Sequence, residues 1–284
     1  MNLAFSPPLP DADRLKSQRV CARGLLTVRR RGGRTRIERL SQEGAAKIRM
    51  PRTDADPLEA VLINTAGGLT GGDRLAWEME AGVGSSLVVT TQASEKVYRA
   101  SSGQQAETSV RLSVGEGGSV AWLPQETIMF DRAAFSRRLD VELAMGATAL
   151  IAEATVFGRS AMGERVENGF FRDRWRVSCG GRLTHAEDFF VGPEVRAFLA
   201  GSAALGGAAA MATVLLVGDE TESWLDRVRE IVGEEGGAST WSVGGTGKLL
   251  ARLYAGDGYG LRKRLVPLLG LLNGRAGLPK CWSL

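Results

Sequence analysis

A glycine-rich segment, NTAGGLTGGDRL at residues 64–75, is the first candidate for chemistry in this sequence. It places four glycines within six positions and follows them with Asp73. Loops of this kind either cradle phosphate groups or let the backbone turn sharply. The spacing, GGxxGG, differs from the dinucleotide-binding pattern, and the next residues, RLAWEME, are typical of a strand. We therefore expect a connection between two strands, with Asp73 accepting hydrogen bonds from nearby amides.

A second glycine-rich segment, GGTGK at residues 244–248, resembles part of a P-loop. A true P-loop would have a glycine at position 242 and a hydroxyl residue after the lysine, but the chain has Ser242 and Leu249 there. We expect a tight turn with an exposed lysine. A nucleotide-binding protein that uses this segment stays an alternative.

The sequence contains few histidine and cysteine residues that could bind a metal ion or act as a nucleophile. His185 is the only histidine, which excludes a multi-histidine metal site within one chain, and we expect a structural role for it. The three cysteines, Cys21, Cys179 and Cys281, are far apart and form no CxxC pair. Free thiols in a reducing cytoplasm are the expected state, so we expect a cytoplasmic protein.

The carboxylates show no spacing that requires an acid–base pair. They include Glu126, Glu153, Glu164 and Glu187. Glu153 stands in an apolar run, IAEATVF, where a charge is costly unless it has a partner or a function. A salt bridge to Arg159 or Arg165 is the structural interpretation of Glu153, and a polar function is the other.

The elements that must position these residues are mostly strands from residue 58 to about 190. LEAVLIN, LAWEME, SLVVTT, TSVRLSV and SVAWLP are short β-type runs, and SRRLDVEL and FFRDRWRVS alternate with a period of two. In the last segment Asp173 is a charged exception among the apolar positions. This pattern predicts a mainly β protein with stacked sheets or a solenoid-like architecture and no fixed sequence repeat.

The pattern changes after about residue 195. ATVLLV predicts a strand, DETESWLDRVREIVGEEGG a helix with a capping box of Asp219 and Glu222, and STWSVGGTGKLLARLYAG a hairpin. GLRKRLVPLLGLLNG predicts a second helix. We expect a β-rich body at 1–195 and a small α+β portion at 196–284, with about two α-helices, packed together as one compact unit.

Composition excludes several classes of protein. The net charge is only +4, and the basic segment VRRRGGRTRIERL lacks interleaved aromatic residues, so we expect a solvated hairpin turning at Gly32–Gly33 and no nucleic-acid partner. The longest small-apolar run, AFLAGSAALGGAAAMATVLLV, is broken by glycines, so we expect no membrane span. Residues 1–16 lack the pattern of a signal peptide.

Four segments together resemble a known family. NTAGGLTGGDRL, TTQASEKVYRAS, AWLPQETIMFDRAAFSRRLDVEL and FGRSAMGE occur in the order and approximate spacing of the urease accessory protein UreD family, also called UreH. The resemblance is strong over residues 18–190 and concerns only general layout beyond them. Thr65 and Ala66 stand where the family usually has prolines, and QASEK stands where it more often has Pro-Gly before the lysine. The matched motif residues are Gly67, Gly68, Gly71, Gly72, Pro124, Gln125, Gly158, Arg159, Gly163 and Glu164.

The resemblance implies two stacked layers of strands with a helix-like winding, and a scaffold rather than an enzyme. Such a scaffold acts with UreF and the GTPase UreG on the urease apoprotein, during GTP-dependent incorporation of nickel. It implies no tightly bound cofactor, but a transient Ni²⁺ path, to which we assign Asp73, Glu153 and Glu187. Lys96, Tyr98 and Arg99 of EKVYR are expected to face a partner or to form a polar strand end.

A β-solenoid enzyme that acts on a polymer through paired carboxylates is the main alternative to the scaffold. The absence of a turn-by-turn sequence repeat disfavours this enzyme. A groove containing two carboxylates at the separation found in hydrolases would favour it.

Overall fold

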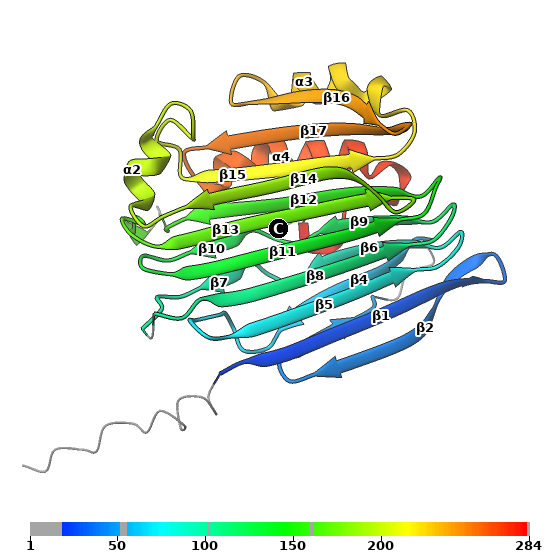
Figure 1. The fold of residues 1–284 in the computed structure, drawn as a ribbon, viewed down its shortest axis with the longest axis horizontal. Helices are drawn as coiled ribbons and strands as arrows, with labels where there is room; N and C mark the ends of the chain where they lie inside the picture. The colour runs from blue at the N-terminus through cyan, green and yellow to red at the C-terminus, as the bar shows by residue number, and fades with distance from the viewer. Residues whose placement is uncertain (1–18, 52–55, 102, 160–161, 283–284) are drawn as a thin grey trace, which may run out of the picture.

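The computed structural model describes residues 19–51, 56–101, 103–159 and 162–282. It contains two β-sheets that lie face to face (Figure 1). In sheet A the order is β14 (Arg182–Val191), β13 (Phe170–Cys179), β11 (Ala134–Leu143), β8 (Ala106–Val114), β5 (Arg74–Ala81), β1 (Cys21–Arg31) and β2 (Arg34–Glu43). The N-terminal residues 1–16, predicted not to be a signal peptide, lie outside the described part.

Sheet B is the larger sheet. Its order is β16 (Gly236–Val243), β17 (Thr246–Ala255), β15 (Ala210–Val217), β12 (Thr148–Phe157), β9 (Ser119–Leu123), β6 (Ser86–Thr91), β4 (Leu58–Asn64) and β3 (Ala46–Arg49). Two short strands, β7 (Glu95–Val97) and β10 (Thr127–Met129), pair with each other, and β10 also pairs with β12. The prediction of a mainly β protein with two stacked layers is therefore confirmed.

The chain winds between the two sheets. It passes from β5 to β6, then to β8, β9, β11, β12 and β13. Among these strands, neighbours within each sheet are therefore parallel. Short turns connect sheet A to sheet B at one end of the stack. Longer connections return from sheet B to sheet A at the other end, at residues 65–73, 92–105, 124–133 and 158–169. The helix-like winding is thus confirmed.

The main core fills the space between the sheets. Alternate side chains point into it, and Phe171, Trp175 and Val177 of β13 are at most 1% exposed, as the period-two pattern predicted. A second cluster lies on the other face of sheet B, where Val214 packs with Leu265 and other leucines of the last helix. Sheet B is therefore apolar on both faces, which explains the nearly continuous apolar run around Glu153.

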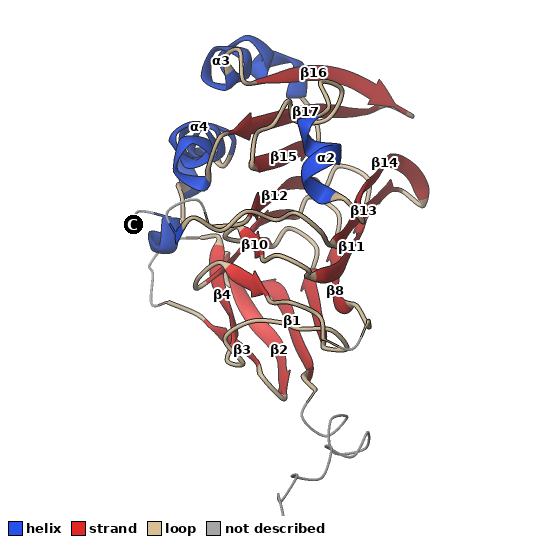
Figure 2. Cartoon of the chain, turned by 90° about the vertical axis from the view of Figure 1, so that its left-hand side faces the viewer, coloured by secondary structure: helices blue, strands red, loops and turns tan. Residues whose placement is uncertain are grey.

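The C-terminal strands extend sheet B, because β15 pairs with β12 and β17 pairs with β15. Helices α3 (Leu225–Val232) and α4 (Gly258–Leu272) cover the outer face of this sheet, and α2 (Val195–Ala200) lies near β14 (Figure 2). Short 3₁₀ helices occur at η2 (Thr221–Trp224), η3 (Gly274–Ala276) and η4 (Lys280–Trp282). The strands of residues 196–284 therefore share a sheet with those of residues 1–195.

Local sequence signals, such as turn glycines, account for most boundaries of these strands and helices. The β1–β2 hairpin turns at Gly32 and Gly33, which both have positive φ. The predicted helix after residue 219 is present, but its expected capping box of Asp219 and Glu222 is wrong. The segment enters through η2, whose N-cap Glu220 has a φ of 58° and makes no side-chain cap. With Asp219 as N-cap, Glu220 would be the first helical residue and would need right-handed helical dihedrals, which its positive φ excludes.

Candidate functional site

The glycine-rich loop between β4 and β5 is held from inside by Asp73. The Asp73 carboxylate is 3% exposed and accepts hydrogen bonds from the amides of Val20 at 2.9 Å and Thr70 at 2.8 Å. Gly68 and Gly71 lie so close to residues 96–105 that a Cβ on either would collide with that segment. As predicted, the loop connects two strands and is capped by Asp73. Its backbone amides donate hydrogen bonds to other groups of the protein.

The EKVYR segment pairs with this loop through its backbone. The Leu69 amide donates to the carbonyl of Lys96 at 2.7 Å, and the Tyr98 amide donates to the carbonyl of Leu69 at 2.8 Å. The side chains of Lys96, Tyr98 and Arg99 are exposed. The structure thus places this segment at the surface of the end that carries the long connections.

The WLPQE motif joins the β-rich body to the last helix. Pro124 and Gln125 are buried, and the Arg262 guanidinium of α4 donates to Gln125 Oε1 at 2.8 Å and to Glu126 Oε1 at 2.7 Å. The indole of Trp282 donates to the carbonyl of Leu123 at 3.1 Å. These contacts make the motif a structural junction.

The two ends of the GRSAMGE motif pair with each other at the same end of the stack, through a bridge between Arg159 and Glu164. Arg159 pairs with Glu164 at 2.5 Å and lies over the ring of Phe130 at 4.4 Å. Gly158 and Gly163 both have positive φ, which favours glycine. The two central residues of the motif, Ser160 and Ala161, lie outside the described residues. Arg159 is therefore not the partner of Glu153.

The true partner of Glu153 comes from the opposite sheet. Arg137 of β11 bonds to Glu153 of β12 and, with Nε at 3.0 Å and Nη2 at 2.5 Å, to both oxygens of Asp173 on β13. We call Arg137, Glu153 and Asp173 the inner cluster. Two indoles complete it, because Trp122 donates to Glu153 at 2.8 Å and Trp175 donates to Asp173 at 3.0 Å.

The inner cluster holds two carboxylates and one guanidinium away from water. All three side chains are buried, with side-chain exposures of 5% for Arg137, 3% for Glu153 and 11% for Asp173. Burial raises the pKa of Glu153 to about 7, and the nearby Arg137 opposes this rise. One cation cannot neutralise two carboxylates, so Glu153 takes up a proton more readily than an exposed glutamate.

A second charged group lies where β14 of sheet A faces β17 of sheet B. Both oxygens of Glu187 accept hydrogen bonds from Nη2 of Arg252, at 2.6 and 2.7 Å. His185 Nε2 lies 3.7 Å from Glu187 Oε2. Lys248 donates to the carbonyl of Thr184 and lies 4.6 Å from the Trp241 ring centroid. We call His185, Glu187, Lys248 and Arg252 the edge cluster.

The edge cluster corrects one expectation from the sequence. Lys248 of GGTGK was expected to be exposed, but it is only 2% exposed. Its segment does form the predicted tight turn, because Gly244 and Gly245 have positive φ between β16 and β17. Lys248 then points toward sheet A, where its burial lowers the pKa of the ammonium group.

His185 is buried beside these cations. Burial, followed by the charges of Lys248 and Arg252, lowers the pKa of His185 to about 4. The imidazole is therefore neutral at pH 7. Its packing near Trp175, with ring centroids 6.4 Å apart, agrees with the structural role expected from the sequence.

The two clusters lie at one level of the interlayer space. Glu153, Thr213 and Arg252 are register neighbours on β12, β15 and β17 of sheet B. Thr213 is 6% exposed and separates the clusters within this sheet. The structure thus brings Glu153 and Glu187 into one polar band, whereas Asp73 lies in the β4–β5 connection.

Besides Lys248, three residues of this band were not recognised as site residues in the sequence. Arg137 and Asp173 both occupy apolar positions of alternating strands, and this was the signal that could have revealed them. Arg252 gave no such signal, because it is largely exposed and its strand pattern is ordinary.

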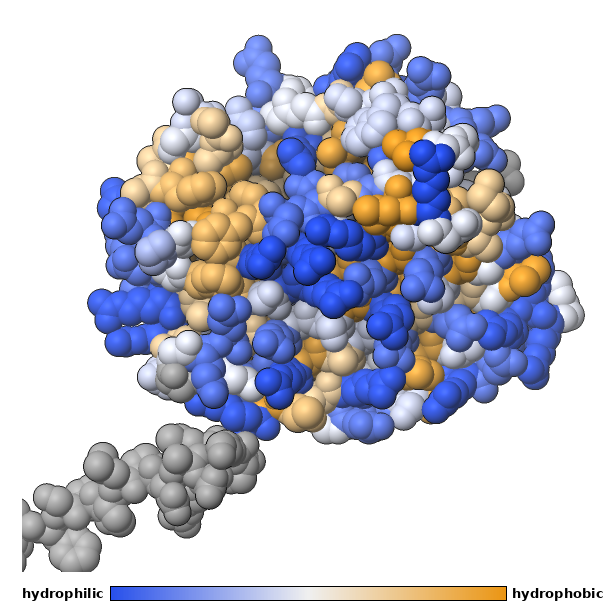
Figure 3. Space-filling model, viewed as in Figure 1, coloured by the Kyte–Doolittle hydropathy of each residue, from blue (hydrophilic) through white to orange (hydrophobic). Residues whose placement is uncertain are grey.

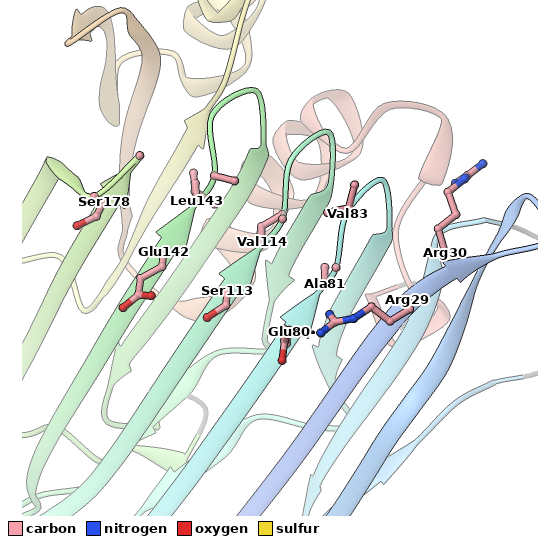
Figure 4. A pocket seen from close by; sticks show the side chains of 15 residues that line it. Arg29, Arg30, Glu80, Ala81, Val83, Ser113, Val114, Glu142, Leu143 and Ser178 are labelled. Atoms are coloured by element: carbon pink, nitrogen blue, oxygen red, sulfur yellow. Dashed lines mark hydrogen bonds and ion pairs between the residues drawn. The ribbon is translucent and has the colours of Figure 1, made fainter.

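The outer face of sheet A offers a groove of about 950 Å³. It lies near the short turns, and Figure 4 shows Glu80 and Glu142 from β5 and β11 among its lining side chains. Arg29 pairs with Glu80 at 2.5 Å, so this glutamate is not a free carboxylate. The groove therefore does not join two free carboxylates in the way that a hydrolase requires.

The rest of this face is mostly hydrophilic (Figure 3). Ion pairs cover it, for example Arg23–Glu78 and Arg172–Asp188, both at 2.8 Å. Phe190 of β14 and Phe198 of α2 are exposed apolar residues. In the described residues, three or more His, Cys, Asp or Glu side chains nowhere gather closely enough to hold a metal ion. No described helix is long and apolar enough to span a membrane.

Comparisons with known proteins agree on one family. The sequence profile of the UreD urease accessory protein matches residues 21–283. The chain is 64% identical over 280 residues to the urease accessory protein UreD of Mesorhizobium japonicum, covering 99% of this chain and 97% of that protein. It is 58% identical over 270 residues to urease accessory protein UreD 1 of Brucella abortus, covering 95% and 96%. It is 56% identical over 273 residues to the corresponding protein of Brucella anthropi, with the same coverage.

Proposed function

Since this chain belongs to the UreD urease accessory protein family, we propose that it serves urease maturation as a scaffold that passes nickel between its two sheets. The chain is a urease accessory protein and not an enzyme. The nickel path and the identity of the partners go beyond this family membership.

The observation that supports the path is the position of Glu153 and Glu187 at one interlayer level. Carboxylate and imidazole groups both bind nickel, and Glu187 lies close to His185. A path must also release the ion, which isolated carboxylates allow better than a closed set of ligands. Glu187 lies at the edge between β14 and β17, and Glu153 lies deeper, so the two define an entrance and an interior position.

Asp73 stays a candidate through the family resemblance alone. Both of its carboxylate oxygens are used by backbone amides, so a metal ion would have to displace the cap that shapes the glycine-rich loop. We therefore expect replacement of Asp73 to act first on the fold of this loop. Any loss of nickel transfer would follow from that change.

The partners in this proposal are UreF, the GTPase UreG and the urease apoprotein. Nucleotide chemistry belongs to the GTPase, because the two glycine-rich segments of this chain form a capped connection and a hairpin turn. We assign exposed Lys96, Tyr98 and Arg99 to a contact with a partner. The free cysteines agree with a cytoplasmic location, which we include in the proposal.

The test is a nickel measurement on urease matured with variants of this chain. With Glu187→Gln we expect nickel per urease active site to fall by about tenfold, a loss typical of removing a group that supports a metal site. Asp188→Asn is the matched control, since Asp188 is on the same strand but pairs with Arg172 on the outer face. Wild-type nickel loading with a folded Glu187→Gln variant that still co-purifies with apo-urease would reject the path.

The alternatives from the sequence gain no support from the structure. Membership of an accessory-protein family contradicts an enzyme that acts on polymers, and Glu80 of the groove is paired with Arg29. A nucleotide site at GGTGK would need Lys248 to reach solvent, but this residue is buried.

A further inference from the structure

Arg252 covers the carboxylate of Glu187 in the edge cluster. Its Nη2 lies 2.6 and 2.7 Å from the two oxygens of Glu187, so both oxygens face a cation. The Arg252 side chain is 57% exposed, whereas that of Glu187 is 14% exposed. The guanidinium therefore reaches inward from a solvated position, and it can turn into water without losing its hydration.

The contact of Arg137 with Glu153 is of a different kind. The Arg137 side chain is 5% exposed and bonds to Asp173, Glu153 and Thr127 at the same time. Moving it would leave two buried carboxylates without a counter-ion, which is strongly unfavourable. Of the two arginines in the band, only Arg252 can leave its carboxylate at low cost.

Departure of Arg252 would free the carboxylate of Glu187 beside His185, so that two metal-binding groups of one strand are available together. Glu187 and His185 are two residues apart on β14 and share its inner face. In the described residues His185 Nε2 has no hydrogen-bond partner, although His185 is 6% exposed. Lys248 does not replace Arg252, because it is held by the carbonyl of Thr184 and the ring of Trp241.

We propose that Arg252 is the gate of the nickel path: it blocks Glu187 while paired and admits the ion to Glu187 and His185 when it turns outward. This inference rests on the proposed function, since it concerns the same path. Arg252 binds no metal itself, because a guanidinium has no free lone pair for a cation. It acts by controlling access to Glu187, so its removal should strengthen binding of nickel to the isolated chain.

The experiment is a titration of the full, ¹⁵N-labelled chain with nickel chloride at pH 7. Paramagnetic Ni²⁺ broadens the amide signals of residues close to it, and the signals of β14 and β17 report on binding at Glu187. We expect Arg252→Gln to lower the nickel concentration needed for half-broadening by about fivefold, the equivalent of a partly exposed ion pair of 1 kcal/mol. Thermal unfolding confirms that each variant is folded.

Two further variants make the result specific. Arg172→Gln frees Asp188, a carboxylate of the same strand that lies on the outer face and accepts from both Nε and Nη2 of Arg172. We expect no change in broadening with this control. In the double variant Arg252→Gln, Glu187→Gln the gain should disappear. An unchanged affinity with Arg252→Gln, or a gain that persists in the double variant, would overturn the gate.

This readout is independent of urease. If Glu187→Gln abolishes nickel loading while Arg252→Gln leaves nickel affinity unchanged, the gate is wrong and the path stands. If Arg252→Gln strengthens binding through Glu187 but Glu187→Gln still yields nickel-loaded urease, Arg252 does cover a metal-binding carboxylate. In that case this carboxylate has no part in delivery, so both the path and its gate are wrong.

Discussion

The inner cluster and the edge cluster use the same chemistry under opposite conditions. Each pairs an arginine with a glutamate between sheets A and B, but Arg137 is 5% exposed and Arg252 is 57% exposed. The inner cluster joins the sheets from within the core, and the edge cluster joins them where they open to solvent. Burial, and not the type of residue, therefore decides which contact is permanent and which can exchange.

This difference separates a structural role from a functional one. A buried ion pair adds little net stability compared with an apolar pair, yet loss of one partner is severe. A partly exposed pair is weak and its loss is mild. We therefore expect the inner cluster to be essential for the fold and the edge cluster to be available for function.

The largest effect should come from Arg137→Met. It leaves Glu153 and Asp173 buried without a counter-ion, and we expect a loss of about 3–5 kcal/mol in the free energy of unfolding. Urea denaturation followed by circular dichroism measures it. Adding Glu153→Leu and Asp173→Leu to this variant should recover much of the loss. A loss below about 1 kcal/mol for Arg137→Met alone would show that the inner cluster is not essential.

The next effect is the pH dependence of the inner cluster. The folded pKa of Glu153, about 7, lies above its ordinary value of 4.5, so the folded state holds this proton more tightly. The contribution of Glu153 to the free energy of unfolding is therefore fully present below pH 4.5. It is lost as the pH rises through 7, which lowers the free energy of unfolding by up to about 3 kcal/mol. Arg137 and Asp173 are the charged groups that face Glu153. Denaturation curves at several pH values should show this slope in the wild type and not in Glu153→Gln.

The edge cluster should show the opposite pH dependence, with a smaller amplitude because it is closer to solvent. The pKa of His185 is lowered from 6.5 to about 4, so its contribution is present above pH 6.5 and is lost as pH falls through 4. Lys248, Arg252 and Glu187 are the charged groups that face it. In denaturation curves at several pH values, His185→Gln should reduce the loss of stability at acid pH. An unchanged loss of stability below pH 6.5 in this variant would contradict the lowered pKa.

The smallest effect should come from Arg252→Gln. Because its side chain is half in solvent, we expect a loss of less than about 1 kcal/mol in the free energy of unfolding. The outer pair gives the baseline for comparison, through Arg172→Gln, with a similar or smaller loss. A loss close to that of Arg137→Met would make Arg252 a structural residue and remove the contrast between the clusters.

Much of the fold was predictable because strand periodicity is a local property. The alternation in FFRDRWRVS correctly placed Phe171, Trp175 and Val177 inside, and the glycine pairs correctly marked two hairpins. The cap formed by Asp73 was predictable as well, since its partner Thr70 is three residues away. These features depend on neighbours along the chain.

The site was less predictable because its contacts cross between sheets. Glu153 was recognised as unusual, but its partner was sought at Arg159 or Arg165, whereas Arg137 reaches it from the opposite layer. Lys248 was expected in solvent because a hairpin end is normally exposed. It is buried because β14 lies over that end of β17.

The sequence by itself determined the β-rich body, the turns, the family and the unusual character of Glu153, because periodicity, glycine positions and motifs are read along one chain. Tertiary structure alone decided which charges meet. Stacking of sheet A on sheet B places Arg137 against Glu153 and Arg252 against Glu187 across 16 and 65 positions of sequence. It also decided how exposed each ion pair is to water. The buried pair of Arg137 and Glu153 is therefore a fixed structural contact, and the partly exposed pair of Arg252 and Glu187 is the one that we propose can open.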